Sequence, residues 1–286
     1  FNLLKQMILW IASYPKSGNT WLRSFISTYY FSNKDQFNFN LLKNIKQFPH
    51  EKFFDKKIDS IENAIESWDK SQENITKNKK ITFLKSHSAL AKINNYPFTT
   101  NKHSIGAIYI VRDPRNVISS LSNHYELTFD ESFKFMTDTK KYLLNKKDMG
   151  NFSNFTFLGS WSNHYISWKK NNLFNTYFIK YEDLENNTFD CFKNIVLFIN
   201  KIMNYDRKIN TVRVQKIVES ISFDKLKMKE DLYGFPEGVE SKNNSKINFF
   251  YLGKNNKWEN ILSVKQIDLM NKEFGKDIKN LGYAIY

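Results

Sequence analysis

The stretch that decides the fold is SYPKSGNTW, residues 13–21. It ends the apolar run Met7–Ser13, which lacks polar alternation and therefore predicts a buried parallel strand. Beyond it, apolar side chains recur at helical spacing from Trp21 to Tyr29, which predicts a helix. A strand, a tight loop containing Gly18 and a helix start are typical of an anion-binding site, because the first helix amides and the helix dipole favour negative charge.

The loop itself carries side chains suited to a phosphate. Lys16 supplies a positive charge. The other polar side chains, which supply hydrogen-bond donors, are Ser17, Asn19 and Thr20. The loop is not a Walker A motif, which would need a glycine further upstream and a lysine directly after Gly18. We therefore expect a phosphate-binding loop of another type.

Three further apolar runs predict strands. They are Ile81–Lys85, Ile105–Val111 and Tyr177–Tyr181. Asp113-Pro114 predicts a helix N-terminus, and another helix is expected over residues 188–201. Strands that alternate with helices predict a three-layer α/β/α fold with a central parallel sheet and a P-loop-like loop. In such sheets ligands bind at the carboxyl ends of the strands.

The composition is that of an ordinary globular protein. The chain has 286 residues, of which 41% are hydrophobic and 25% charged, and this excludes wholesale disorder. With 9 Gly, 5 Pro and no internal repeat there is little linker material, so we expect a single domain over residues 1–286. Residues 234–246 collect Gly, Pro, Ser and Asn, which predicts a mobile loop.

The cysteine count, the residue spacing and the length of the apolar runs disfavour disulfides, metal sites and membrane spans. Cys191 is the only cysteine, so an intramolecular disulfide is impossible and a structural zinc site is disfavoured. No His or carboxylate cluster has metal-ligand spacing, so no metal is expected. No apolar run approaches the roughly 20 residues of a membrane span. No signal peptide is recognised, so a cytoplasmic location is expected.

The net charge of +14 favours an anionic partner without selecting one. Lys and Asn are abundant along the whole chain, so the charge reflects a general compositional bias as well as any function. The basic residues are scattered and no nucleic-acid recognition motif is present, so nucleic acid is not an expected partner.

The loop YPKSGNTW, residues 14–21, resembles the phosphosulfate-binding loop of the sulfotransferases that use 3′-phosphoadenylyl sulfate (PAPS). The cytosolic-type enzymes carry YPKSGTTW, so Asn19 stands here in place of a threonine. The resemblance implies that Lys16 contacts the 5′-phosphosulfate and that Trp21 flanks the adenine. The other loop residues expected to bind this donor are Ser17, Gly18, Asn19 and Thr20.

Two other segments resemble further motifs of this family. In residues 108–120 an arginine ends the predicted strand and a serine follows eight residues later, which resembles the 3′-phosphate motif and implies this role for Arg112 and Ser120. A guanidinium suits a phosphate because it can donate two parallel hydrogen bonds. Lys85-Ser86-His87 resembles the family's K-T-H, which implies that His87 is the catalytic base and that Lys85 supports the transferring group.

The adenine motifs match less completely. Tyr181-Glu182-Asp183 resembles a Y-E-D element and Ile221-Ser222-Phe223 a T-S-F element, which implies that Tyr181 and Phe223 contact the base. The last motif of the family is R-K-G-x-x-G-D-W. Gly253 and Trp258 keep its spacing, so Gly253 is expected at the donor site, but Tyr251-Leu252 replaces the Arg-Lys pair. Lys254 and Lys257 are the candidates to supply the missing positive charge.

The resemblance implies a PAPS-dependent sulfotransferase that needs no metal. His87 would activate a hydroxyl, or less readily an amine, on a small-molecule or glycan acceptor. Lys16 and Lys85 would stabilise the leaving adenosine 3′,5′-bisphosphate (PAP). Residues 31–80 and 123–158 match no motif and are expected to shape the acceptor pocket. The acceptor and the oligomeric state stay open.

Two alternatives remain at this point. The first is a nucleotide-binding protein of the same fold without catalysis, which the loss of the Arg-Lys pair at Tyr251-Leu252 suggests. The second is a kinase-like phosphoryl transferase, against which the missing Walker lysine and the lack of a clear magnesium-binding acid both count.

Overall fold

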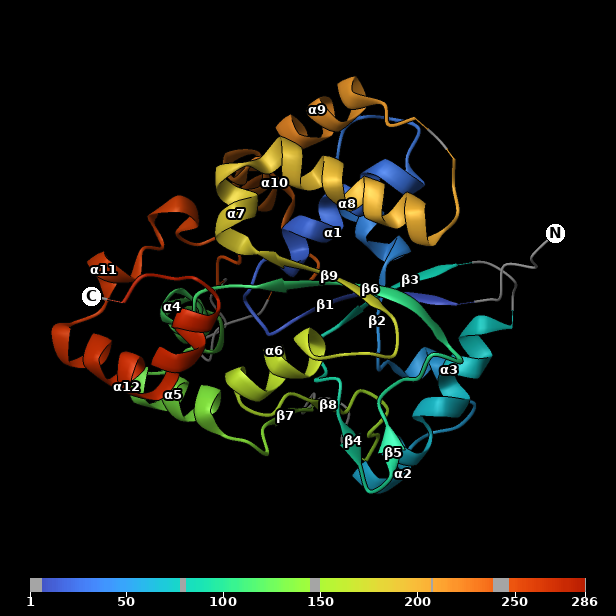
Figure 1. The fold of residues 1–286 in the computed structure, drawn as a ribbon, viewed down its shortest axis with the longest axis horizontal. Helices are drawn as coiled ribbons and strands as arrows, with labels where there is room; N and C mark the ends of the chain where they lie inside the picture. Colours follow the sequence, from blue (N-terminus) through green and yellow to red (C-terminus); the bar gives the residue numbers. More distant parts are fainter. Residues whose placement is uncertain (1–6, 78–80, 145–149, 207, 239–246, 286) are drawn as a thin grey trace.

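The structure is a computed structural model that describes residues 7–77, 81–144, 150–206, 208–238 and 247–285. Its centre is a parallel sheet with the strand order β2-β3-β1-β6-β9. The bounds of these strands are Lys46–Gln47 for β2, Thr82–Ser86 for β3, Ile8–Ser13 for β1, Ser104–Val111 for β6 and Asn175–Lys180 for β9. Helices cover both faces of the sheet (Figure 1), so the predicted three-layer α/β/α architecture is confirmed.

The sequence of β1 explains why it lies at the centre. All six of its residues are buried, as expected of a strand covered on both faces. Trp10 and Ala12 belong to one hydrophobic cluster, whereas Leu9 and Ile11 belong to the other. Alternate side chains of one strand therefore pack into two separate cores, one on each side of the sheet.

One group of helices packs above the sheet as drawn in Figure 1 and another below it. The upper group consists of α1 (Asn19–Phe31), α7 (Tyr181–Asn186), α8 (Thr188–Ile202), α9 (Thr211–Ser220) and α10 (Phe223–Tyr233). The lower group includes α4 (Pro114–Tyr125), α5 (Phe129–Thr137), α6 (Trp161–Lys169) and α12 (Val264–Asn280). The remaining helices are α2 (Ile61–Glu66), α3 (Trp68–Thr76) and α11 (Trp258–Ile261), with the 3₁₀ turns η1 (Phe39–Asn44), η2 (Glu51–Phe53) and η4 (Gly253–Asn255).

Short antiparallel pairs lie outside the central sheet. β4 (Lys92–Ile93) pairs with β5 (Tyr96–Pro97), and β7 (Tyr142–Leu143) pairs with β8 (Thr156–Phe157). The β7–β8 pair, together with η1, η2, α2, α3 and α5, lies in the segments that the sequence left without a motif.

The predicted strands agree with the observed ones within one or two residues, and the difference at the end of β9 concerns a predicted site residue. That strand stops at Lys180, so Tyr181 opens helix α7 and does not end the strand. The helix predicted at Asp113-Pro114 is confirmed, since the Asp113 side chain accepts a hydrogen bond from the Arg115 amide and Pro114 is the first helical residue. Of the predicted loop 234–246, residues 234–238 form neither helix nor strand, and residues 239–246 lie outside the described residues.

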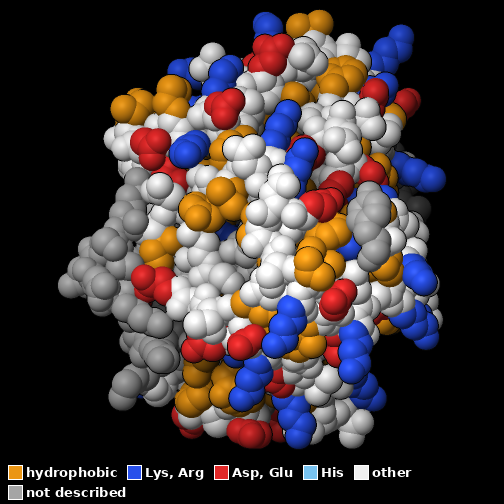
Figure 2. Space-filling view, turned by 90° about the vertical axis from the view of Figure 1, so that its left-hand side faces the viewer, with side chains coloured by type: hydrophobic (Ala, Val, Ile, Leu, Met, Phe, Trp, Pro, Cys, Tyr) orange, Lys and Arg blue, Asp and Glu red, His pale blue; other side chains and the backbone are white. Residues whose placement is uncertain are grey.

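The excess positive charge does not gather into one surface patch on the face shown in Figure 2. Lys and Arg side chains are interspersed there with acidic and apolar ones. None of the helices in the described ranges is both long and apolar enough to cross a membrane.

Candidate active site

The predicted phosphate loop connects β1 to α1 through two left-handed residues. Lys16 has φ 66 and Gly18 has φ 99, and Gly18 is the residue directly before α1. A Cβ on Gly18 would lie 2.6 Å from the Tyr181 ring, so this position combines a positive φ with a close approach that glycine alone meets without strain. The Ser17 hydroxyl is fully buried and has no hydrogen-bond partner among the described residues. The loop thus holds an unpaired hydroxyl next to a helix N-terminus.

Lys16 is a partly buried amine on the cavity-forming loop. Its Nζ lies 3.8 Å from the centroid of the Phe249 ring, which provides a cation–π contact. Burial, followed by repulsion from Arg112 and Lys85, lowers the pKa of Lys16 to about 7. The repulsion from Arg112 and Lys85 shows that three basic groups lie close enough to act on one another, and an anion bound among them would relieve that repulsion.

His87 follows β3 and is held by the end of β1. Its Nδ1 lies 2.8 Å from the carbonyl oxygen of Ser13. A carbonyl can only accept, so Nδ1 carries the proton and Nε2 keeps its lone pair. Burial and the neighbouring Lys85 lower the pKa of His87 well below 6.5, so the imidazole is neutral at pH 7. It is therefore in the form that can accept a proton.

Behind His87 lies a second buried histidine. The Nε2 atom of His164 lies 3.0 Å from the carbonyl oxygen of His87, and its Nδ1 lies 2.8 Å from the hydroxyl of Tyr109. Because the carbonyl needs a donor, Nε2 of His164 carries the proton and Nδ1 accepts from Tyr109. Burial lowers the pKa of His164 to about 4, which keeps this arrangement neutral at pH 7. His164 supports the backbone that carries His87.

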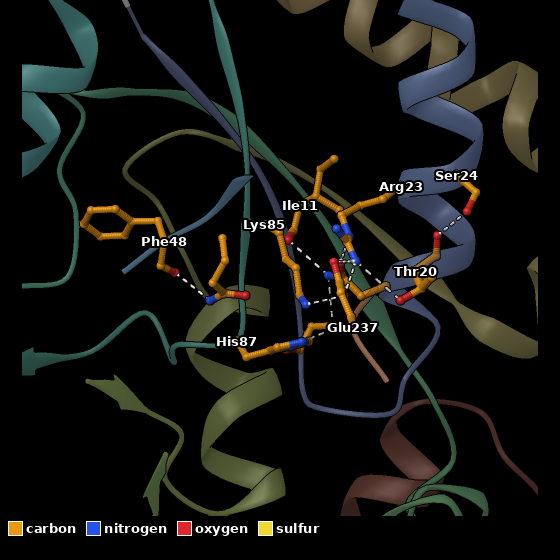
Figure 3. Close-up of polar contacts among 11 residues, drawn as sticks. Ile11, Thr20, Arg23, Ser24, Phe48, Lys85, His87 and Glu237 are labelled. Atoms are coloured by element: carbon orange, nitrogen blue, oxygen red, sulfur yellow. Dashed lines mark hydrogen bonds and ion pairs between the residues drawn. The ribbon is translucent and has the colours of Figure 1, made fainter. Parts of the chain in front are cut away.

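Lys85 and Arg23 share a carboxylate in the same region (Figure 3). Lys85 Nζ lies 3.0 Å from Oε2 of Glu237, and Arg23 Nη2 lies 2.8 and 2.7 Å from the two carboxylate oxygens. Burial and Arg23 lower the pKa of Lys85 to about 8, against the opposing effect of Glu237. Burial raises the pKa of Glu237, but Lys85 and Arg23 outweigh it and hold the value at about 2. The carboxylate is therefore charged.

Arg112 and Ser120 are brought together at the end of β6 and in α4. Arg112 Nη1 donates to Ser120 Oγ at 3.4 Å and to the carbonyl of Lys16 at 3.3 Å, while its guanidinium lies over the Tyr181 ring at 4.1 Å. Its Nε is buried without a hydrogen-bond partner in the part of the chain that the structure describes. Asn256 Nδ2 donates to Ser120 Oγ at 2.9 Å. These groups form one polar cluster with unused donor capacity.

Aromatic side chains lie next to this cluster. The rings of Trp21 and Tyr181 are 5.7 Å apart at an interplanar angle of 60°. Phe223 begins α10, and Gly253, with φ 54, approaches it so closely that a Cβ on the glycine would lie 2.6 Å from the Phe223 ring. Flat rings at the rim of a phosphate site suit a planar base.

Most of these groups line one cavity of about 530 Å³; Arg23 and His164 lie outside its wall. The sequence-predicted residues on its wall are Lys16, Gly18, Asn19, Thr20, Trp21, Lys85, His87, Arg112, Ser120, Tyr181, Phe223 and Gly253. Ser17, although it belongs to the loop, is fully buried and does not line the cavity. Lys254 is on the wall, whereas Lys257 is not.

The structure adds residues that sequence reasoning missed. The cavity wall also includes Gln47, His124, Tyr125, Glu237 and Phe249, and Arg23 lies behind Glu237. Arg23 had a detectable signal, since it follows Asn19 by four residues and so shares its helix face. No local sequence pattern could indicate Glu237, because it contacts Lys85 from 152 positions away in the sequence. No group of three or more His, Cys, Asp or Glu side chains that could hold a metal was found in the described ranges.

Comparison with known proteins agrees with this geometry. The family model described as the sulfotransferase domain matches residues 7–282. The chain belongs to the sulfotransferase family. Among curated relatives, this sulfotransferase is 25% identical to Sulfotransferase 1B1 of Canis lupus familiaris over 272 residues, which cover 94% of this chain and 82% of that protein. It is 23% identical to the Flavonol 3-sulfotransferase of Flaveria bidentis over 282 residues, which cover 97% and 83%.

Solved structures show the same fold. The sulfotransferase resembles mouse sulfotransferase SULT7A1 complexed with PAP at a TM-score of 0.55 and 20% identity, over 96% of this chain and 84% of that one. It resembles retinol dehydratase in complex with androsterone and inactive cofactor PAP at a TM-score of 0.60 and 16% identity, over 98% and 83%.

Proposed function

We propose that this sulfotransferase transfers the sulfonyl group of PAPS to a hydroxyl of a small-molecule acceptor. The observation that carries the proposal is that His87, Lys85, Lys16, Arg112 and Ser120, which come from separate strand ends and helices, line one cavity. PAP is bound in both related structures named above, which supports PAPS as the donor. We further propose that residues 1–286 act as one sulfotransferase domain.

His87 is the proposed base. Its Nε2 lone pair is available because Nδ1 is engaged by the Ser13 carbonyl, and its lowered pKa keeps it neutral. It would take the proton of the acceptor hydroxyl while the oxygen attacks sulfur, and the bond from sulfur to the bridging oxygen would break. The products are the sulfate ester, PAP and a proton that His87 releases to solvent.

Lys16 and Lys85 are the proposed charge stabilisers. Negative charge grows on the bridging oxygen as PAP leaves, and two partly buried ammonium groups on the same cavity wall would meet it. Removal of one such group typically costs about 10²–10³ in rate. These side chains supply the positive charge without a bound cation, so we propose that the reaction needs no metal.

Arg112 and Ser120 are the proposed 3′-phosphate ligands. Two features support a phosphate there. The Nε of Arg112 is buried without a partner among the described residues, and Ser120 Oγ accepts from Arg112 and Asn256, which leaves its hydroxyl proton to donate. Lys254, on the cavity wall, is the proposed substitute for the Arg-Lys pair that Tyr251-Leu252 replaces. The proposed phosphosulfate ligands in the loop are Ser17, Gly18, Asn19 and Thr20, and the proposed adenine contacts are Trp21, Tyr181, Phe223 and Gly253.

Gln47, His124, Tyr125 and Phe249 also line the cavity and match no donor motif, so we assign them to the acceptor. The names of the relatives, a flavonol 3-sulfotransferase and a luciferin sulfotransferase, point to small organic acceptors in those proteins. We therefore propose a small organic alcohol or phenol as the acceptor, with an amine or a glycan as less favoured classes.

Two measurements test the proposal. Thermal unfolding with PAP should show a magnesium-independent rise in melting temperature that Arg112→Ala abolishes, since ligand at about 100 times its Kd adds roughly 2.7 kcal/mol. With PAPS and a panel of phenols, His87→Ala should lose turnover but keep the PAP-induced shift. His50→Ala is the matched control at a histidine outside the cavity.

The other outcomes separate the alternatives. A shift caused by ATP and magnesium alone would favour a phosphoryl transferase. A PAP shift without transfer to any acceptor and without slow hydrolysis of PAPS would favour nucleotide binding without catalysis. Wild-type turnover by His87→Ala would remove the base assignment.

A further inference from the structure

Arg23 is a fixed cation that the proposed mechanism does not use. Its side chain is 1% exposed. Asn19 Oδ1 accepts from Arg23 Nε at 3.0 Å, and the Asn19 amide in turn donates to the carbonyl of Ile11 at 3.1 Å. Thr20 Oγ1 accepts from Arg23 Nη2 at 3.4 Å. The orientation of the guanidinium is therefore set by the phosphate loop and the end of β1, and a buried guanidinium requires an anion.

The anion present is easier to replace than the cation. The side chain of Glu237 is 33% exposed and lines the cavity, and it comes from residues 234–238, which form neither helix nor strand. Phe235, two residues before Glu237, packs on Phe39 and Phe249 at ring-centroid distances of 5.0 and 4.5 Å. These ring contacts do not depend on the Glu237 carboxylate. Withdrawal of Glu237 would break ion pairs without opening the core.

The carboxylate lies where a reacting anion would be expected. Glu237 bridges Arg23 and Lys85, and His87 lies beside them in Figure 3. Both cations act on His87, since Lys85 and Arg23 are among the groups that lower its pKa. The position is therefore next to both the proposed base and a proposed charge stabiliser.

We propose that Arg23 and Lys85 form an oxyanion subsite for the transferring sulfonate of the donor, and that the carboxylate of Glu237 competes for this subsite. The inference rests on the proposed function. Carboxylate and sulfonate are both acceptor-only groups with several oxygens, so the same fork of donors serves either. PAPS carries the sulfonate and PAP lacks it, so the competition should affect one ligand and spare the other.

Isothermal titration of the whole chain with PAPS and with PAP, without acceptor, tests this. Glu237→Gln keeps the shape of the side chain but removes its charge, so the side chain holds the two cations less strongly and competes less with an anion. PAPS should then bind about tenfold more tightly, with PAP changed less than about twofold. Arg23→Gln should weaken PAPS binding more than PAP binding. Asp231→Asn, which removes a charge from the exposed side of α10, is the control and should change neither.

Each other result overturns a defined part of the proposal. Equal effects of Glu237→Gln on PAPS and PAP would place the carboxylate against the nucleotide and not the sulfonate. No effect on either ligand, or weaker PAPS binding, would remove the competition. If Glu237→Gln does not fold, the PAPS-to-PAP ratio of Arg23→Gln decides the subsite. Failure of the wild type to bind PAP at all would overturn the proposed function itself.

Discussion

The side chain of His164 donates from Nε2 to the carbonyl oxygen of His87 at 3.0 Å, from beneath the sheet edge where His87 lies. His164 is fully buried and also accepts from Tyr109, so one imidazole ties helix α6 to strand β6 and to the residue after β3. Since His87 itself is held by Ser13 from β1, the proposed base is positioned from three strands. Such support fixes the direction of Nε2 before any acceptor binds.

His164→Gln should therefore lower kcat more than donor affinity. The amide can occupy part of the same space but cannot both donate to the His87 carbonyl and accept from Tyr109 with unchanged geometry. We expect a fall in kcat of about tenfold, a PAP Kd within about twofold of wild type and a stability loss of about 1–3 kcal/mol. Steady-state kinetics and titration with PAP measure the split. A loss of PAP binding equal to the loss of kcat would contradict a positioning role.

Gly253→Ala should weaken nucleotide binding. The added Cβ would lie 2.6 Å from the Phe223 ring, and the backbone φ of 54 is unfavourable for alanine. We expect Phe223 to be displaced, with a stability loss of about 1–3 kcal/mol and weaker PAP binding. Gly275→Ala is the matched control, since its Cβ would meet only Ile285 at 3.7 Å inside helix α12. That variant should keep PAP binding and gain up to about 1 kcal/mol of stability.

The pH dependence of kcat/KM for the donor should report Lys16. Its pKa of about 7 means that the free enzyme loses this charge as the pH rises through 7, and Lys85 follows near 8. His87 does not limit the rate in this range, because its pKa lies well below 6.5. We expect kcat/KM to fall above pH 7, and Lys16→Arg to delay the fall because arginine stays charged. A wild-type profile that stays flat to pH 9 would refute this.

Mild acid should destabilise the fold through buried histidines. Burial lowers the pKa of His124 to about 3 and of His164 to about 4, and lowers that of His87 in the same direction. Below pH 6.5 the unfolded chain binds protons that these folded side chains do not, so stability falls by up to about 1.4 kcal/mol per pH unit for each histidine. Denaturant unfolding at pH 7.5, 6 and 5 measures this loss. The His164→Gln variant should show a shallower dependence, and an equal dependence would exclude His164 as a contributor.

Most of the fold could be predicted from local sequence. The uninterrupted apolar runs of β1 and β6 and the strand–loop–helix unit at residues 13–21 carry their signal within a few neighbours. The end of β9 was placed one residue too late because Tyr181 is as apolar as the strand before it. Its ring packs against Arg112 and Gly18 from the start of α7. Strand β2 went unpredicted, since its two residues pair with β3 through backbone groups that leave no pattern in the side chains.

The predicted site residues share their cavity because parallel strands end at one sheet edge. The sequence could not indicate residues that reach the site only through tertiary contacts. Glu237 meets Lys85 only when the segment after α10 folds over the sheet edge. Asn256 likewise reaches Ser120 and Asn116 from beyond η4, which no local spacing indicates. From charge alone, Lys254 and Lys257 were equal candidates to replace the Arg-Lys pair. In the structure only Lys254 of these two lines the cavity.

Lys254→Ala should weaken binding of the 3′-phosphate, and Lys257→Ala should not. Lys254 lies on the cavity wall with Ser120 and Arg112, whereas Lys257 is outside that wall. Because Lys254 is exposed to solvent, we expect only about a three- to tenfold loss of PAP affinity, shrinking as salt rises. Adenosine 5′-monophosphate lacks the 3′-phosphate, so its affinity should change by less than about twofold. Titrations of both ligands at two salt concentrations measure the difference. Equal losses for the two lysine variants, or equal losses for the two nucleotides, would show that Lys254 does not replace the missing Arg-Lys pair.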